Sequence, residues 1–96
     1  MHIFFNEQDI ANAVCVFVAD LERTQPENVE IEFQFDEEEG VRCIAKTHRD
    51  FFYGEQQIAD SIGFFLEEFH NFESHSMEIL LGFDEDNGVT SQITIT

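Results

Sequence analysis

Apolar residues recur at helical spacing in two separate stretches of the chain. In residues 7–22 (EQDIANAVCVFVADLE) they stand at positions 10, 14, 17, 18 and 21, which is one broad stripe along a helix. Asn6 is a suitable N-cap with Asp9 three residues later, and Pro26 lies beyond the predicted end. The stripe returns further along the chain at Ile58, Ile62, Phe65, Leu66 and Phe69. The pattern therefore predicts two amphipathic helices.

Alternation of apolar and polar residues follows each predicted helix. Residues 29–35 (VEIEFQF) alternate strictly, which is typical of a strand with one buried and one solvated face. Residues 77–83 (MEILLGF) repeat the pattern less cleanly, and a further strand is predicted in 41–47 and in 89–96. The residues predicted to face the core are Val29, Ile31, Phe33, Phe35, Val41, Cys43, Ala45, Met77, Ile79, Leu81, Phe83, Val89, Ile93 and Ile95.

The two halves of the chain match one another without a gap when the second half is laid on the first. The acidic phrase FDEEEGV at 35–41 then coincides with FDEDNGV at 83–89, and the apolar stripes of the two helices coincide as well. Matching spacing over both halves is not expected from a single recurring motif. We therefore predict one domain over residues 1–96, built from pseudo-repeats at 1–48 and 49–96.

Each pseudo-repeat is interpreted as a helix followed by a β-hairpin, an αββ unit. Because each strand has one apolar face, both helices are expected to cover the same face of the sheet. The predicted fold is α+β, a two-layer sandwich in which an antiparallel sheet of four or more strands carries two helices on one face. The short apolar segments HIFF (2–5) and DFFY (50–53) either add edge strands or staple the start of each helix.

The composition is strongly acidic, with 21 Asp and Glu against 4 Lys and Arg and a formal net charge of −17. Phosphate backbones and anionic lipids would repel such a chain, so we expect no nucleic acid and no membrane as partners. No apolar run approaches the ~20 residues of a membrane span, and the N-terminus has no signal-peptide pattern. These features predict a cytoplasmic protein. The charge leaves a second interpretation open, an acidic mimic that occupies a basic, nucleic-acid-binding protein.

The two acidic phrases invite a metal-binding interpretation, but their spacing favours turns. In an EF-hand loop with glycine at position 6, Phe35 or Phe83 would stand at position 1, where an oxygen ligand is required. Glycine instead supplies the positive φ of a tight hairpin, and Asn87-Gly88 is a strong hairpin signal. We predict two hairpin turns, and weak divalent-cation binding at their carboxylates stays an alternative.

The remaining residue types show no catalytic pattern. Cys15 and Cys43 are predicted to be buried thiols without a basic neighbour. Glu67, His70 and His75 lie close together in the sequence, yet a structural zinc site needs more Cys or His ligands than these. No serine elbow or glycine-rich phosphate loop is present. We expect no cofactor, no metal site and no enzymatic activity.

Four apolar residues fall on faces that the pattern predicts to be polar. Val16 and Phe64 occupy equivalent positions on the two helices, whereas Ile44 and Leu80 point to the outer face of the sheet. They are either isolated surface residues and contacts between the two helices, or a partner surface. The leading hypothesis is a non-enzymatic protein–protein interaction module that self-associates, as a homodimer, through the outer sheet face or the flank around Phe64.

The segment EQDIANAVCVFVADLERTQPENVEIEFQFDEEEGV, followed by QQIADSIGFFLEEF, resembles the YxcD-like family of small acidic uncharacterised proteins of Bacillus-type bacteria. The shared pattern is an E-Q opening, a helix, a Q-P-E-x-V-E strand start and an acidic turn, over nearly the whole chain. The resemblance implies a cytoplasmic bacterial protein of unknown function and carries over no catalytic residue.

Overall fold

The computed structural model describes residues 1–73 and 76–96, which form two helices and six strands in that part of the chain. The elements are β1 (His2–Phe5), α1 (Glu7–Glu22), a 3₁₀ helix (Pro26–Asn28), β2 (Glu30–Asp36), β3 (Gly40–Lys46), β4 (Asp50–Tyr53), α2 (Glu55–His70), β5 (Met77–Asp84) and β6 (Gly88–Ile95). Both predicted helices and all four predicted strands are confirmed. The two short apolar segments are strands as well.

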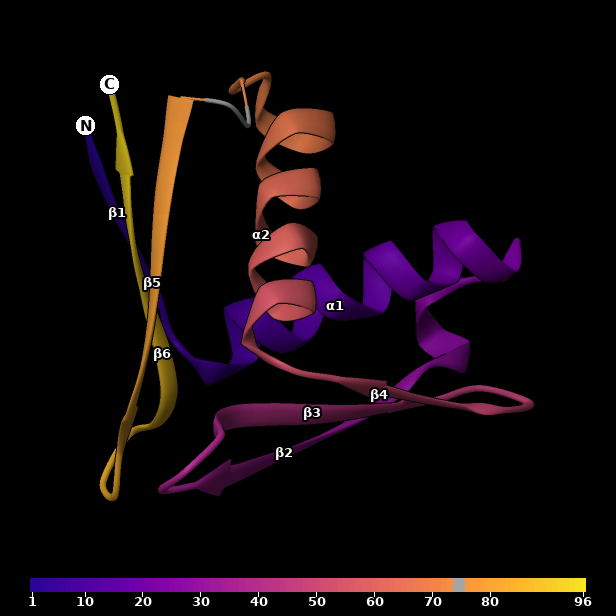
Figure 1. Cartoon of the computed structure of the whole chain (residues 1–96). Helices are drawn as coiled ribbons and strands as arrows, with labels where there is room; N and C mark the ends of the chain where they lie inside the picture. The colour runs from indigo at the N-terminus through magenta and orange to yellow at the C-terminus, as the bar shows by residue number, and fades with distance from the viewer. Residues whose placement is uncertain (74–75) are drawn as a thin grey trace.

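The strands form two antiparallel sheets of three strands each (Figure 1). Sheet A has the order β1-β6-β5, and sheet B has the order β2-β3-β4. The two sheets lie at a steep angle to one another, and both helices fill the space between them (Figure 1). The α+β class is confirmed, whereas the prediction of one sheet of four or more strands with both helices on one face is wrong.

Strand pairing beyond the two hairpins gives each sheet its third strand. The N-terminal strand β1 crosses to the second half of the chain and pairs with β6, so that Phe5 lies opposite Ser91. Strand β4 pairs back onto β3, with Phe51 opposite Ala45. Both central strands therefore have a neighbour on each side. Neither has an edge left with which to join the other hairpin.

One hydrophobic core lies between the helices and the two sheets. The helices bury most of each predicted stripe, but its last member is exposed in both, Leu21 at 54% and Phe69 at 58%, and the central strands bury alternate side chains. Its largest fully buried members are Ile10, Val14, Val18, Val41, Cys43, Ile58, Ile62, Leu66, Val89 and Ile93. The buried hydroxyls are paired, since Ser61 Oγ donates to the Gln57 carbonyl and Ser91 Oγ to the Leu80 carbonyl.

The predicted N-cap of the first helix is confirmed. Asp9 N donates to Asn6 Oδ1 at 2.8 Å, and Asn6 N donates to Asp9 Oδ2 at 3.0 Å, which is a complete capping box. Helix α2 begins after Gly54, whose N–H donates to Gln57 Oε1. The start of α1 thus depends on two residues that the sequence pattern identifies.

Two of the strand residues predicted to face the core are exposed. Phe35 is 47% exposed and Phe83 is 44% exposed. Their rings stack on one another with centroids 4.6 Å apart and planes 11° from parallel. Both stand at the end of a strand next to a hairpin turn, where each ring covers one face of the other instead of entering the core.

Candidate interaction surfaces

The two acidic phrases form hairpin turns, as predicted. Asp36 pairs with Gly40 and Asp84 pairs with Gly88, so each turn is closed by the same pair of residue types. The glycines have φ of +81° and +74°, a left-handed conformation that favours glycine. The glycine at the end of each acidic phrase is therefore required by backbone geometry.

The first carboxylate of each turn is used inside the turn. Asp36 Oδ1 accepts from Glu38 N at 2.7 Å, and Asp84 Oδ1 accepts from Asp86 N at 2.8 Å. The backbone N–H of Asp86 and the side chain of Asn87 lower the pKa of Asp84. These oxygens stabilise the turns, while the other acidic side chains of the tips are exposed.

Each turn is also held by a glutamate from the other half of the chain. Val41 N donates to Glu55 Oε2 at 2.9 Å, and Val89 N donates to Glu7 Oε1 at 3.0 Å. The carboxylates lie so close to the turn glycines that a Cβ on Gly40 would collide with Glu55. The sequence analysis missed these contacts. The sequence feature that could have indicated these contacts is that glutamate stands at equivalent positions of the two predicted pseudo-repeats.

Metal ligands are not gathered in the part of the chain that the structure describes. Within residues 1–73 and 76–96, no group of three or more His, Cys, Asp or Glu side chains is arranged to hold a metal ion. His70 packs against the ring of Phe65, with centroids 5.5 Å apart. His75 lies outside the described residues. Weak cation binding at the turns stays a hypothesis.

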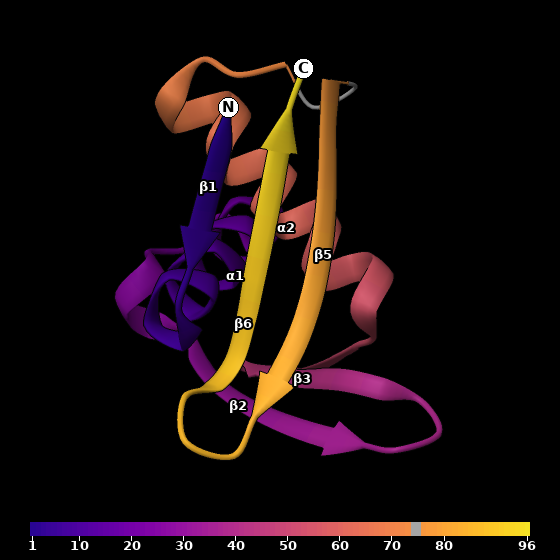
Figure 2. The same ribbon diagram turned by 90° about the vertical axis from the view of Figure 1, so that its left-hand side faces the viewer.

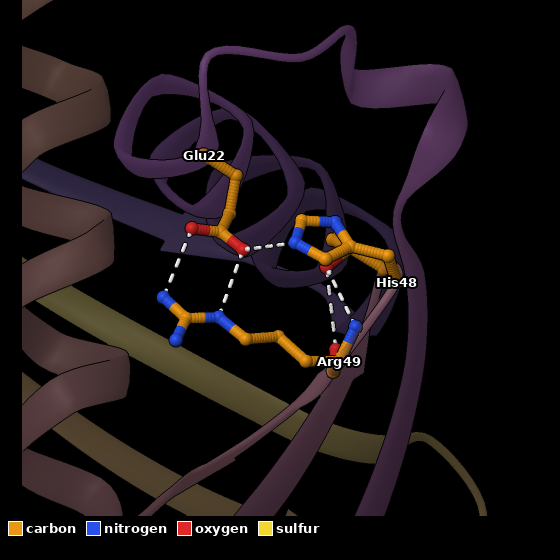
Figure 3. A network of polar contacts seen from close by, with 4 residues as sticks. Glu22, His48 and Arg49 are labelled. Atoms are coloured by element: carbon orange, nitrogen blue, oxygen red, sulfur yellow. Dashed lines mark hydrogen bonds and ion pairs between the residues drawn. The ribbon is translucent and has the colours of Figure 1, made fainter.

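A polar network joins the end of α1 to the loop between β3 and β4 (Figure 3). Arg49 donates from Nε to Glu22 Oε1 at 3.0 Å and from its terminal nitrogen to Glu22 Oε2 at 3.1 Å. His48 Nε2 lies 3.5 Å from the same carboxylate, whose side chain is 10% exposed. The hydrogen bond from Arg49 lowers the pKa of Glu22. The guanidinium also lies over the Phe51 ring, so the network anchors this loop.

The two cysteines are free thiols inside the fold. Cys43 is buried, and desolvation together with Cys15 raises its pKa to about 12. Cys15 is half-buried, its thiol donates to the Val29 carbonyl at 3.6 Å, and burial raises its pKa. Neither thiol has the lowered pKa of a nucleophile.

Val16 and Phe64 come together between the two helices. Both are half-buried and line a hollow of about 220 Å³. The Phe64 ring meets Phe17 of α1 edge to face, with centroids 5.5 Å apart. This contact between helices accounts for an apolar residue on the predicted polar face of α2.

Ile44 and Leu80 lie on the outer faces of different sheets. Ile44 is half-buried and pairs with Phe52 across sheet B, where Phe52 is 66% exposed. Leu80 is 59% exposed on sheet A, and Phe4 (56% exposed) stands on the opposite edge strand of the same face. Gln92 lies between these two side chains, because it pairs with both.

The outer faces of the two sheets differ in their number of charged side chains. By strand alternation, the outer face of sheet B carries Glu30, Glu32, Gln34, Asp36, Arg42, Ile44, Lys46, Asp50 and Phe52. The outer face of sheet A carries His2, Phe4, Glu78, Leu80, Gly82, Asp84, Thr90, Gln92 and Thr94. The sheet A face thus holds two carboxylates and no lysine or arginine, whereas the sheet B face holds four carboxylates and two basic side chains. Both helices lie behind sheet A (Figure 2), so no helix of the described residues covers its outer face.

A groove runs between α2 and the edge strand β5. Its larger part has a volume of about 490 Å³ and is bordered by Ala59, Gly63, Phe64, Met77 and Ile79. A smaller part of about 270 Å³ continues it along the same strand past Leu81. The charged residues that line the two parts are all acidic, namely Glu55, Asp60 and Glu67. The sequence analysis missed this groove.

The sequence matches a protein family over residues 1–86, and the family is described as "Protein of unknown function (DUF2653)". The chain belongs to this family. Membership in DUF2653 supports the resemblance to an uncharacterised family, whereas the YxcD-like name and the Bacillus-type origin stay predictions. No curated protein and no solved structure matches the chain. Among the described residues, neither helix has the length and apolar character that crossing a membrane requires.

Proposed function

We propose that this DUF2653 protein is a non-enzymatic interaction module that self-associates through the outer face of sheet A. The observation that carries the proposal is the small number of charged side chains on this uncovered face of a chain with net charge −17. Two copies of so acidic a chain repel one another over most of their surface. The sheet A face offers the exposed apolar side chains of Phe4 and Leu80 with few charged groups to desolvate.

The face is self-complementary under a two-fold axis parallel to its strands. Such an axis reverses the order of the strands, so that the edge β1 of one copy lies over the edge β5 of the other. Phe4 then faces Leu80 of the second copy, and His2 faces Glu78. Gln92 meets its own counterpart on the axis. Stacked sheets pack about 10 Å apart, which suits side chains of this size.

The proposal includes a duplicated architecture. The two helices begin at Glu7 and Glu55, which are equivalent positions of the predicted pseudo-repeats, and both halves have the order βαββ. The reciprocal bonds from these glutamates to the opposite hairpins support two copies of one unit that hold each other. Each hairpin turn would then need a glutamate from the other half of the same chain.

The test is light scattering behind size-exclusion chromatography over a wide range of concentrations. The wild type is expected to shift from monomer to dimer. Leu80→Asp and Phe4→Asp are expected to weaken the dimer at least about tenfold, because each buries an unpaired charge in the interface. Phe52→Asp is the matched control, since Phe52 is the counterpart of Phe4 in the second half and lies on the outer face of the other sheet.

Circular dichroism establishes that each variant is folded. A wild-type protein that stays monomeric at every concentration would remove the proposal. A dimer that resists Leu80→Asp and Phe4→Asp but dissociates with Phe52→Asp would move the interface to sheet B.

A further inference from the structure

The edge of β5 next to the groove is open to another strand. Thr96 N donates to the Ser76 carbonyl, so Ser76 faces β6, and in an antiparallel pair the direction alternates along the strand. The N–H and C=O groups of Ile79 and Leu81 therefore point away from β6. Within residues 1–73 and 76–96, no strand pairs with them. An unpaired strand edge is a template for an added strand.

The opposite wall of the groove leaves room for that strand. Ala59 and Gly63 are the small residues of α2 that border it, and they stand one helical turn apart. The position equivalent to Gly63 in the first half is Cys15, whose thiol reaches the Val29 carbonyl. The second half has no side chain at the corresponding place. The groove thus combines an open backbone edge with an apolar wall set back by small residues.

The charges around the groove select the occupant. Glu55, Asp60 and Glu67 line it, and Glu78 projects from the outer face of the same strand. A second copy of this chain would bring its own carboxylates against these. An extended segment with lysine or arginine would be attracted to them.

We propose that the groove between α2 and β5 binds an extended, basic segment of another protein, which adds as a fourth strand to sheet A. Backbone hydrogen bonds to Ile79 and Leu81 would supply affinity. Apolar side chains of the segment would pack toward Ala59 and Gly63, and the alternating basic side chains would point to the outer face of sheet A, on the side of Glu78. The groove and the outer face meet at β5, because Leu80 also borders the smaller part of the groove, so the two proposals are tested with separate variants.

The test uses a defined probe, a seven-residue peptide that alternates valine and lysine, with both ends blocked and a fluorescent label. Fluorescence anisotropy with the Phe4→Asp variant measures its binding without relying on a dimer. A peptide that alternates valine and glutamate is the charge control. We expect binding of the lysine peptide only, and failure of the lysine peptide to bind would overturn the proposal.

N-methylation of the peptide separates strand addition from attraction between charges. One isomer is methylated on its valine nitrogens and the other on its lysine nitrogens, so each has one edge blocked. Because only one edge can face β5, one isomer is expected to lose binding at least tenfold while the other retains it. Equal binding of both isomers would refute strand addition.

Two matched pairs of variants locate the site on the protein. Ala59→Phe fills the groove and is expected to weaken binding at least tenfold, whereas Ala11→Phe, at the equivalent position of α1, leaves it unchanged. Glu78 is exposed on the outer face of β5, so Glu78→Gln tests the attraction to lysine without a steric change, with Glu30→Gln, at the equivalent position of β2, as its control. Binding that responds equally to both members of each pair would place the peptide elsewhere and would overturn the assignment.

Discussion

Gly40→Ala tests how the two halves of the chain hold each other. Gly40 has φ of +81°, and its Cα lies against the carboxylate of Glu55, which accepts a hydrogen bond from Val41 N at 2.9 Å. A methyl group at this position meets two obstacles. The left-handed backbone disfavours alanine, and the Cβ displaces the carboxylate that holds the turn.

The two obstacles have separable costs. An L-residue in the left-handed region costs ~1–2 kcal/mol. Loss of the hydrogen bond to a partly exposed carboxylate costs a further ~1–2 kcal/mol. Gly40→Ala is therefore expected to lower the free energy of unfolding by ~2–4 kcal/mol in total, or roughly 10–25 °C in Tm for a domain of this size. In a Glu55→Ala background only the backbone term remains, so the same change should cost ~1–2 kcal/mol.

Urea unfolding followed by far-UV circular dichroism suits the double-mutant cycle of Gly40→Ala and Glu55→Ala. Circular dichroism is used because the chain has no tryptophan, and urea is used because it does not alter the screening of the charges. Gly82→Ala is the control for a glycine in a strand. A Cβ there lies 3.5 Å from Thr90 Oγ1, an ordinary contact, and the change is expected to be within about 0.5 kcal/mol. Glu37→Ala, at the exposed tip of the same turn, controls for the removal of one negative charge.

The reasoning predicts a coupling energy of ~1–2 kcal/mol between positions 40 and 55. If Gly40→Ala costs the same with and without Glu55, the carboxylate does not hold the turn in solution. Gly88→Ala and Glu7→Ala form the corresponding cycle in the second hairpin, where a Cβ would lie 2.5 Å from Glu7 Oε1. Agreement between the two cycles would show that the contacts are reciprocal.

Two further predictions concern titratable groups. Hydrogen bonding from Arg49 lowers the folded-state pKa of Glu22, so this carboxyl stabilises the protein above its unfolded pKa and the stabilisation is lost as the pH falls through the folded pKa. Glu22→Gln should therefore lower Tm at pH 7, and the difference from wild type should shrink as the pH falls through the lowered folded-state pKa; a difference independent of pH would contradict the ion pair. Because burial raises the pKa of Cys43 to about 12, its thiol in a Cys15→Ser variant should resist a disulfide reagent at pH 8 until urea unfolds the chain, and prompt reaction of the native protein would contradict that burial.

Local structure was predictable because its signals are local. The capping box of Asn6 and Asp9 and the apolar stripe between positions 10 and 21 specify α1 without reference to any other segment. The turns at Gly40 and Gly88 follow from the positive φ that their geometry needs. Each of these features depends on contacts between residues close in the sequence.

The assembly of the strands was not predictable from the same signals. Alternation identifies β1 and β4 as strands, but it does not say that Phe5 will pair with Ser91, which lies at the opposite end of the chain. It also assigns Phe35 and Phe83 to the apolar side of their strands without showing how far the helices reach. At the strand ends the two rings meet each other, with centroids 4.6 Å apart.

Of the candidate surfaces, the sequence also predicts only the part that depends on local alternation. Leu80 was found because alternation alone places it on the outer face of its strand. The groove was missed because it depends on α2 lying beside an unpaired edge, and the sequence shows only that Ala59 and Gly63 are small. The available signal was the comparison with the first half, where Ala11 and Cys15 stand at the equivalent positions. Cys15 has a side chain at the place where Gly63 has none.

The two halves agree at the turns and differ elsewhere, both in the buried core, as at Cys43 and Ser91, and on the outer faces. The glutamates that hold the turns and the glycines that close them are the same in both. On the outer faces, by contrast, Glu32 in sheet B corresponds to Leu80 in sheet A, and Lys46 corresponds to Thr94. This difference is expected if the outer face of sheet A, which joins β1 of the first half to β5 and β6 of the second, is a binding surface while the outer face of sheet B stays in solvent. Both proposed surfaces, the outer face of sheet A and the groove beside β5, involve the second half.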